Sequence, residues 1–592
     1  MLKKKLFLLT FALTLLPCIS VAAQTASDVV VERNVAMKTR DGVTLRADIY
    51  RPAGDGNFPV LLQRTPYSKE YTAVFGRRAA ARGFMVVTQD VRGRFTSEGE
   101  WYTFKHESDD GYDAVEWAAA LPHSNGKVGM FGGSYVGATQ MLAAISHPPH
   151  LAGICPVVTA SNYHENWTYQ GGAFEQWFNE SWTSSLAADT FNRSLHEGTN
   201  ALIGSKVLPL QQYPLFNADL GPGSAGYARK LAPYFLDWLD HSTYDSYWKQ
   251  WSIEENYANI QVPALTVTAW YDIFQGGSLR NFMGLQAHAG NDAARAGQRL
   301  FVTIGGHAGA GRTIGTVDFG TAATEYEEDG ITLDWYEYLF QGKQNQFAKA
   351  TPVRIFVMGE NKWRDEEAWP LKRAVTTSYF LQSGGKANSA SGDGALSTTA
   401  KQTQSSDKFV YDPGNPVPTV GGPLCCDGNH LPGGPRDQKD VESRPDVLVY
   451  STDPLKEDLE VTGPVTLDLY ASSSAVDTDF TAKLVDVWPN GFAQNLTEGI
   501  LRASYRESTV VAKPIVPGKV YEYKIDMWST SNVFLKGHQI RLEVSSSNFP
   551  RFDRNLNTGK SANTESIFVK ATNTIFHDLA HPSALLLPMV PR

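Results

Sequence analysis

The sequence has few cysteines, and none of them lies in a metal-binding pattern. Only four occur among 592 residues, and no Cys/His cluster has the spacing of a zinc site. An EF-hand loop and a P-loop motif are also absent. These absences exclude the common zinc, calcium and nucleotide-binding modules, so we expect neither a metal ion nor another cofactor.

Long apolar runs are lacking except near the N-terminus. There, MLKKK precedes LFLLTFALTLL and then the small residues of SVAAQ. This order is typical of a secretory signal peptide, and the apolar run is shorter than the ~20 residues of a membrane-spanning helix. We therefore expect a signal peptide at residues 1–23 and an exported protein, periplasmic or extracellular, that has no membrane association after cleavage. The proline before Cys18 disfavours lipid attachment at that cysteine.

Positively charged residues are also fewer than negatively charged ones. The sequence has 53 Lys and Arg and 62 Asp and Glu, which gives a net charge of −9. An acidic surface argues against nucleic acid or anionic lipid as a partner. A small molecule is the expected partner, and the oligomeric state stays open, a homo-oligomer included. Export permits disulfides, so the adjacent Cys425 and Cys426 are either a vicinal disulfide or, with Cys155, free buried thiols.

Strand and helix patterns divide the chain into three regions. Strands and helices alternate in residues 24–160 and again in 260–350, which predicts a parallel sheet in an α/β domain. Residues 161–259 between them are dense in aromatic residues and predict an inserted helical cap. Residues 351–592 hold short, regularly spaced β-rich runs, starting with VRIFVMG, and predict an all-β sandwich or jelly roll.

The segment KVGMFGGSYVGAT places Ser134 between a short apolar strand and a predicted helix. A nucleophile elbow needs glycines around such a serine, but the usual G-x-S-x-G pattern has glycine where Val136 stands, and Gly137 follows one residue later. The segment GPGSAG at residues 221–226 has similar spacing without a preceding strand, so we interpret it as a loop. The strand context favours a nucleophilic role for Ser134.

Two further side chains follow predicted strands in the order that this architecture requires. Asp272 follows VPALTVTAWY and His307 follows RLFVTIGG, so a carboxylate and an imidazole lie at carboxyl ends of strands after the serine. Asp90 also ends a strand but precedes Ser134, and we expect it to support the site through an ion-paired loop. The order Ser134, Asp272, His307 predicts a catalytic triad.

These segments, together with RTPYSK, QDVRGRFTSEGEW and AWYDIF, resemble the cocaine esterase-like (CocE/NonD) branch of the X-Pro dipeptidyl-peptidase family. The family's elbow reads G-x-S-Y-x-G, which matches Gly132 to Gly137. The resemblance covers nearly the whole mature chain and implies an α/β-hydrolase core with an inserted helical cap, followed by a jelly-roll domain. It implies Ser134 as nucleophile, His307 as general base and then acid, and Asp272 as the group that orients the imidazole.

The resemblance also implies an oxyanion hole made by the backbone N–H of Tyr135 and the hydroxyl of Tyr67. Substrate contacts are expected from Trp167, Trp177 and Phe274, although packing in the core of the cap explains each of these aromatic residues equally well. The sequence thus predicts an exported serine esterase or amidase for small acyl substrates.

Three other functions remain as alternatives. Related α-amino acid ester hydrolases bind the substrate ammonium with acidic residues near the catalytic acid, but Ile273, Phe274 and Gln275 carry no carboxylate. Glu165 and Glu175 of the cap are the other candidates, so X-Pro dipeptidyl-peptidase or α-amino acid ester hydrolase activity is the second prediction. An exported carbohydrate-binding protein without catalysis is third, and metal-assisted hydrolysis lacks a ligand set.

Overall fold

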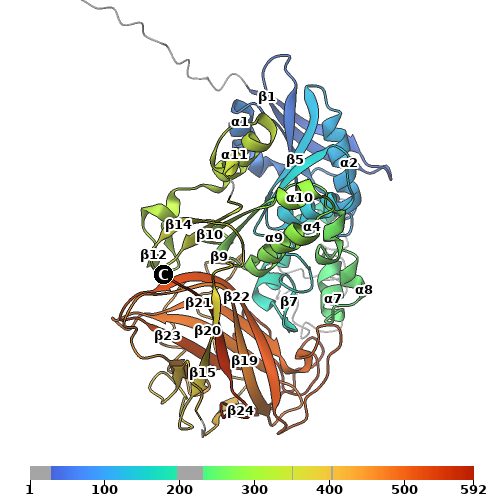
Figure 1. The fold of residues 1–592 in the computed structure, drawn as a ribbon. Coiled ribbons are helices and arrows are strands. Elements are labelled where there is room, and N and C mark those ends of the chain that lie inside the picture. The colour runs from blue at the N-terminus through green and yellow to red at the C-terminus, as the bar shows by residue number, and fades with distance from the viewer. Residues whose placement is uncertain (1–28, 197–230, 350, 402–404) are drawn as a thin grey trace, which may run out of the picture.

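A computed structural model describes residues 29–196, 231–349, 351–401 and 405–592 of the chain. It has an α/β domain, a group of cap helices and an all-β domain (Figure 1). The predicted signal peptide and the GPGSAG segment lie outside the described residues. Within the described ranges, no helix combines the length and the apolar character that crossing a membrane requires.

Ten strands form the α/β sheet in the order β1-β2-β4-β3-β5-β6-β9-β10-β13-β14. Every neighbouring pair from β4 to β13 is parallel, and the outer pairs β1–β2, β2–β4 and β13–β14 are antiparallel. The strands are β1 (Val29–Lys38), β2 (Thr44–Pro52), β3 (Phe58–Thr65), β4 (Met85–Asp90), β5 (Ser124–Gly133), β6 (Leu151–Val157), β9 (Leu265–Tyr271), β10 (Arg299–Gly306), β13 (Val353–Val357) and β14 (Lys362–Glu366).

Helices cover both faces of this sheet, because successive strand residues point to opposite sides. On β3, Leu61 packs in one apolar cluster with α1 and α11, whereas Leu62 packs in another with α2 and α3. The helices of this domain are α1 (Ala73–Ala81), α2 (Glu107–Ala119), α3 (Tyr135–Ile145), α9 (Gln275–His288), α10 (Asp292–Ala296) and α11 (Glu328–Gln341). The predicted alternation of strands and helices is confirmed.

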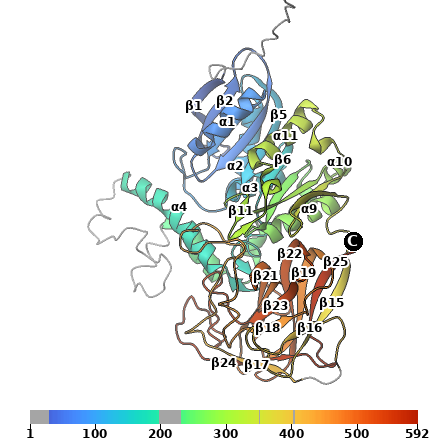
Figure 2. The same cartoon turned by 90° about the vertical axis from the view of Figure 1, so that its left-hand side faces the viewer.

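The inserted cap lies on one flank, where the α/β and all-β domains meet (Figures 1 and 2). Its helices are α4 (Gln176–His196), α7 (Pro233–Asp240) and α8 (Ser246–Lys249). A small antiparallel hairpin, β7 (Tyr169–Gln170) and β8 (Ala173–Phe174), stands where the sequence predicted only helices and loops. Its two turn residues, Gly171 and Gly172, have φ of 54° and 82°, a left-handed pair that suits a tight hairpin turn.

The all-β domain has eleven paired strands and follows the jelly-roll prediction. The strands are β15 (Val375–Gln382), β16 (Ala395–Ser397), β17 (Asp407–Tyr411), β18 (Leu448–Ser451), β19 (Leu459–Ser473), β20 (Asp479–Val487), β21 (Ala493–Arg502), β22 (Tyr521–Phe534), β23 (Gln539–Ser545), β24 (Ala571–Phe576) and β25 (Ala584–Val590). The boundary predicted at residues 350 and 351 falls too early, because β13 pairs with β10 and extends the α/β sheet. The run VRIFVMG is therefore the parallel neighbour of a core strand and not the start of the second domain.

The two domains share one apolar core rather than touching through a thin linker. Trp270 and Phe356 of the first sheet belong to the same buried cluster as Leu467 and Ile525 of the second. Backbone hydrogen bonds join them as well, from Met358 N–H to the Ser531 carbonyl at 3.0 Å. The position of the all-β domain is thus fixed relative to the strands that end at the candidate site.

Candidate active site

The turn that carries Ser134 connects β5 directly to α3. Ser134 has φ of 61° and ψ of −127°, a region that residues other than glycine rarely occupy. Its backbone N–H donates to the Val157 carbonyl of the neighbouring strand at 2.9 Å. This tight turn holds the serine above the carboxyl ends of the strands, as a nucleophile elbow requires.

The packing around the elbow explains why glycine stands at 137 and not at 136. A Cβ on Gly137 would lie 2.7 Å from Thr159 Cβ and 3.1 Å from the Val157 carbonyl oxygen, whereas Val136 fits as a buried side chain. Glycine is required at position 132 as well, because a Cβ there would lie 2.5 Å from Val136 Cγ1. The close approach between α3 and the loop after β6 therefore falls one residue later than in the usual pattern.

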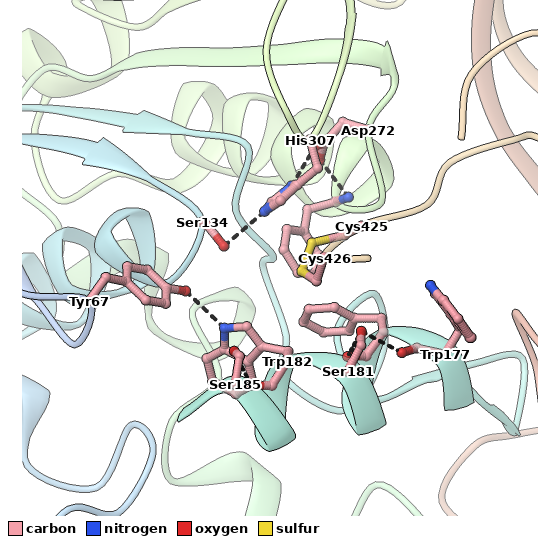
Figure 3. Close-up of a disulfide and its surroundings, with 12 residues drawn as sticks. Tyr67, Ser134, Trp177, Ser181, Trp182, Ser185, Asp272, His307, Cys425 and Cys426 are labelled. Atoms are coloured by element: carbon pink, nitrogen blue, oxygen red, sulfur yellow. Dashed lines mark hydrogen bonds and ion pairs between the residues drawn. A yellow bond between two sulfur atoms is a disulfide. The ribbon is translucent and has the colours of Figure 1, made fainter. Parts of the chain in front are cut away.

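His307 and Asp272 meet Ser134 in a continuous line of hydrogen bonds (Figure 3). His307 Nε2 lies 3.0 Å from Ser134 Oγ, and His307 Nδ1 lies 2.7 Å from Asp272 Oδ2. The Asp272 side chain is fully buried, and its Oδ1 accepts the Phe274 backbone N–H at 2.6 Å. Because the carboxylate is fixed and faces Nδ1, it favours the tautomer that leaves Nε2 free to accept the serine proton.

The two predicted oxyanion donors lie beside Ser134. Tyr135 is the first residue of α3, so its backbone N–H has no carbonyl one turn earlier in the helix. Its side chain is fully buried, where its hydroxyl accepts the Phe104 N–H and donates to Glu107. The Tyr135 side chain therefore anchors the helix start, and the backbone N–H faces the Tyr67 hydroxyl.

The Tyr67 phenol reaches across from the loop after β3. Trp182 Nε1 donates to the Tyr67 hydroxyl at 2.9 Å. Burial raises the pKa of Tyr67, while hydrogen bonds with Trp182, with the Ser134 hydroxyl and with the Tyr135 backbone act to lower it. The same contacts put the phenolic oxygen next to the serine hydroxyl and the helix N–H, where an oxyanion would form.

The Tyr67 loop is held in place by the polar segment after β4. Arg94 Nε donates to the Pro66 carbonyl at 2.9 Å, and buried Asp90 accepts the Lys69 backbone N–H at 2.8 Å. Lys69 Nζ also lies 3.3 Å from Asp90. Asp90 thus lies in an ion-paired support for the loop that carries Tyr67, away from the Ser134–His307 pair.

The three predicted substrate-contact residues fall in different places. Trp167 and Phe274 are fully buried and stack at a centroid distance of 4.4 Å, and Phe274 meets the edge of the His307 ring at 5.2 Å. They therefore form the apolar backing of the imidazole. Trp177 is half-buried on α4, and its backbone N–H donates to the Pro550 carbonyl of the all-β domain at 3.0 Å.

Sequence reasoning missed two contributors to the site. Trp182 lies on the cap helix and binds Tyr67, but a tryptophan inside an aromatic-rich helix carries no local signal of that contact. The second is a Cys425–Cys426 disulfide from the all-β domain, which lies among Ser134, His307, Tyr67 and one face of α4 (Figure 3). That face carries Trp177, Ser181 and Ser185 at helical spacing. The adjacency of the cysteines indicated a bond but gave no location for it.

The described residues contain no group of three or more His, Cys, Asp or Glu side chains able to hold a metal ion. The polar groups that converge here are a serine, an imidazole, a carboxylate, a phenol and a backbone N–H at the start of a helix. This is the set used in nucleophilic acyl transfer.

Comparison with known proteins assigns the chain to a family. Residues 41–309 match the X-Pro dipeptidyl-peptidase (S15 family) model, and residues 345–586 match the X-Pro dipeptidyl-peptidase C-terminal non-catalytic domain. The cocaine esterase of Rhodococcus sp. (strain MB1 Bresler) is 38% identical over 95% of this chain and 99% of that protein. The chain belongs to the CocE/NonD branch of the X-Pro dipeptidyl-peptidase family. It is therefore a hydrolase of a serine esterase and peptidase family.

Solved structures show the same architecture over nearly the whole chain. An aminopeptidase from a marine sediment Thaumarchaeota archaeon is 26% identical, with a TM-score of 0.79 over 95% of this chain and 97% of that one. An α-amino acid ester hydrolase is 24% identical and matches with a TM-score of 0.80 over 97% and 99% of the two chains. The predicted fold, an α/β-hydrolase core with a cap and an all-β jelly-roll domain, is confirmed.

Proposed function

We propose that this protein is an exported serine hydrolase that cleaves ester or amide bonds of small acyl substrates through an acyl-enzyme on Ser134. The observation that carries the proposal is the line of hydrogen bonds from Ser134 through His307 to the buried Asp272. Export rests on the signal-peptide pattern of residues 1–23.

In the first half of the reaction, Ser134 Oγ attacks the substrate carbonyl carbon and its proton passes to His307 Nε2. The imidazolium that forms is stabilised by the Asp272 carboxylate at Nδ1. Negative charge develops on the carbonyl oxygen, which accepts from the Tyr135 N–H and the Tyr67 hydroxyl. When the tetrahedral intermediate collapses, His307 gives the proton to the departing alcohol or amine, and the acyl group stays on Ser134.

In the second half, water replaces the departed group next to His307. The imidazole takes a proton from the water as it attacks the acyl carbon, and the same oxyanion donors hold the second tetrahedral intermediate. Collapse returns the proton from His307 to Ser134 Oγ and releases the carboxylic acid. One donor set thus serves both halves of the cycle.

The acidic residues of the cap favour an uncharged acyl group over one with a free ammonium. Glu175 is buried, 3.8 Å from Arg551, and burial raises its pKa to about 7. Glu165 accepts the Gly171 backbone N–H at 3.2 Å and lies 3.5 Å from the His164 ring. A carboxyl group that is partly neutral, or already bound within the cap, is a weak partner for a substrate ammonium.

The proposal is tested with initial rates on aryl esters with and without a free α-amino group and on an X-Pro anilide. The wild type is compared with Ser134→Ala, and both are treated with a fluorophosphonate probe. We expect hydrolysis of the unsubstituted esters and probe attachment at Ser134, both lost in the variant. Preference for the amino-bearing substrates would transfer the assignment to aminopeptidase or amino-ester hydrolase. Folded protein without any adduct on Ser134 would support the carbohydrate-binding alternative.

A further inference from the structure

The Cys425–Cys426 disulfide joins the all-β domain to the candidate active site. Cys425 is 7% exposed and packs in the same apolar cluster as Phe274, Phe178 and Trp182, whereas Cys426 is exposed to solvent. Figure 3 shows the disulfide below His307, facing the space that Ser134 and α4 also border. Cys425 thus belongs to the wall of the site, while Cys426 is a solvent-exposed residue.

The loop that carries the disulfide is fixed at its base. Gly422 and Gly434 exchange two backbone hydrogen bonds, each 2.8 Å long, and so close off residues 423–433. Just outside this closure, the Pro435 carbonyl accepts the Thr316 N–H at 3.0 Å, in the segment that follows His307. The base of the loop is therefore tied to the α/β domain by bonds that do not involve sulfur, and only the tip depends on the disulfide.

The backbone at the tip has a conformation that the disulfide helps to maintain. Cys426 has φ of 77°, in the left-handed region that residues other than glycine and asparagine rarely adopt. The bond between adjacent cysteines closes a small ring that includes their shared peptide group, so the two residues cannot rotate independently. With two separate thiols, Cys426 is free to return to a negative φ and to move the wall that Cys425 forms.

We propose that the oxidation state of the Cys425–Cys426 pair sets the acyl selectivity of the enzyme. The disulfide holds the wall for bulky acyl groups, and reduction by a dithiol loosens it. In that step a thiol of the reductant attacks the sulfur of the exposed residue Cys426 and the S–S bond breaks. Two electrons and two protons pass to the pair, giving two thiols, and the reductant becomes a disulfide. This inference rests on the proposed hydrolase function.

The test compares oxidised and reduced enzyme on two substrates. Protein is reduced with dithiothreitol and desalted without oxygen, because free dithiol would itself cleave aryl esters. The gain of two thiols is verified by titration. We expect kcat/KM for 4-nitrophenyl benzoate to fall about 10-fold in the reduced form and to recover on reoxidation, while 4-nitrophenyl acetate changes less than about 2-fold. A small acyl group does not reach the wall, so its rate reports on the triad alone.

Two variants separate the disulfide from other effects. The double variant Cys425→Ser/Cys426→Ser is expected to have the low kcat/KM for the benzoate after both the oxidising and the reducing treatment. Cys155→Ala should lose benzoate activity on reduction as the wild type does. Cys155 is buried, and burial raises the pKa of its thiol to about 12, so it stays unreactive in folded protein.

Equal benzoate rates in the two verified oxidation states would overturn the inference, and so would equal losses for both esters, since those indicate general loosening. Failure of the proposed hydrolase function is distinguishable, because the oxidised enzyme would then neither hydrolyse the acetate nor bind the fluorophosphonate probe.

Discussion

Replacement of Tyr67 by phenylalanine tests the oxyanion hole by removing a single oxygen atom. The Tyr67 hydroxyl accepts the Trp182 indole N–H at 2.9 Å and lies next to Ser134 and the Tyr135 backbone N–H. Since the hydroxyl accepts from the indole through a lone pair, it keeps its own proton to donate to a ligand oxygen. An oxygen that gains negative charge beside Ser134 is the strongest acceptor within its reach.

The magnitude follows from that geometry. Loss of one donor to an oxyanion costs roughly 10²- to 10³-fold in kcat, because the bond strengthens as charge develops in the transition state. The KM should change little, since the carbonyl of the bound substrate is only weakly charged. Tyr67→Phe also leaves the indole N–H of Trp182 without its partner. This costs folding stability on the order of 1–3 kcal/mol at most, which thermal unfolding reports separately.

The assay is a steady-state comparison of kcat and KM on an aryl acetate, with Trp182→Phe as the matched control. That control removes the indole N–H but keeps the phenol, so we expect a loss of less than about 10-fold, from weaker polarisation of the hydroxyl. A kcat for Tyr67→Phe within about 3-fold of the wild type would refute the oxyanion role and leave Tyr67 as a packing residue. A rise in KM at constant kcat would instead indicate ground-state binding.

Three further outcomes follow from the site and its surroundings. Gly137→Ala brings a Cβ to 2.7 Å from Thr159 Cβ, so it should lower the melting temperature, at a cost of about 1–3 kcal/mol, and reduce kcat. Glu175 has its pKa raised from 4.5 to about 7 by burial, so the folded state loses up to ~3 kcal/mol as the pH rises through that interval. Glu175→Gln should therefore melt higher than wild type at pH 8 but not at pH 4. His307→Ala should lower kcat on an aryl acetate to the level of Ser134→Ala, because no base then accepts the serine proton, and a kcat near that of the wild type would contradict its role as base.

Much of the fold was predictable because its signals are local. Continuous apolar strands such as FPVLLQRT alternate with helices, and this pattern alone indicates a parallel sheet that is buried on both faces. The order of Ser134, Asp272 and His307 at strand ends was visible for the same reason, since parallel strands bring their carboxyl ends to one edge. The distances between the three side chains agree with that topological argument.

The errors occurred where tertiary contacts override local pattern. VRIFVMG has the composition of any buried strand, and only its pairing with β10 assigns it to the first sheet. Strand β21 looks polar in the sequence because of Gln494, Asn495 and Glu498, yet these side chains are buried. Each finds a specific partner, such as Arg551 for Glu498 at 2.5 Å. Polar residues such as these can be buried because they bind partners that are far away in the sequence. The spacing of apolar residues along the chain gives no sign of those partners.

The all-β domain fixes the position of Asp272, a member of the proposed triad, although it supplies none of the triad residues itself. Residues on both sides of Asp272 form hydrogen bonds to the all-β domain. The Tyr271 hydroxyl donates to the Asn495 carbonyl at 2.8 Å, and Gln275 Nε2 donates to the Ser529 carbonyl at 2.5 Å. Gln275 also accepts the Ser529 N–H at 3.2 Å, so its amide pairs with the backbone of β22 as a second strand would. Since small displacements of an orienting carboxylate cost large factors in rate, clamping its turn on both sides restricts the motion that matters most. The second domain therefore contributes to the candidate active site through the position of Asp272 as much as through the wall at Cys425, and we expect activity to be lost without it.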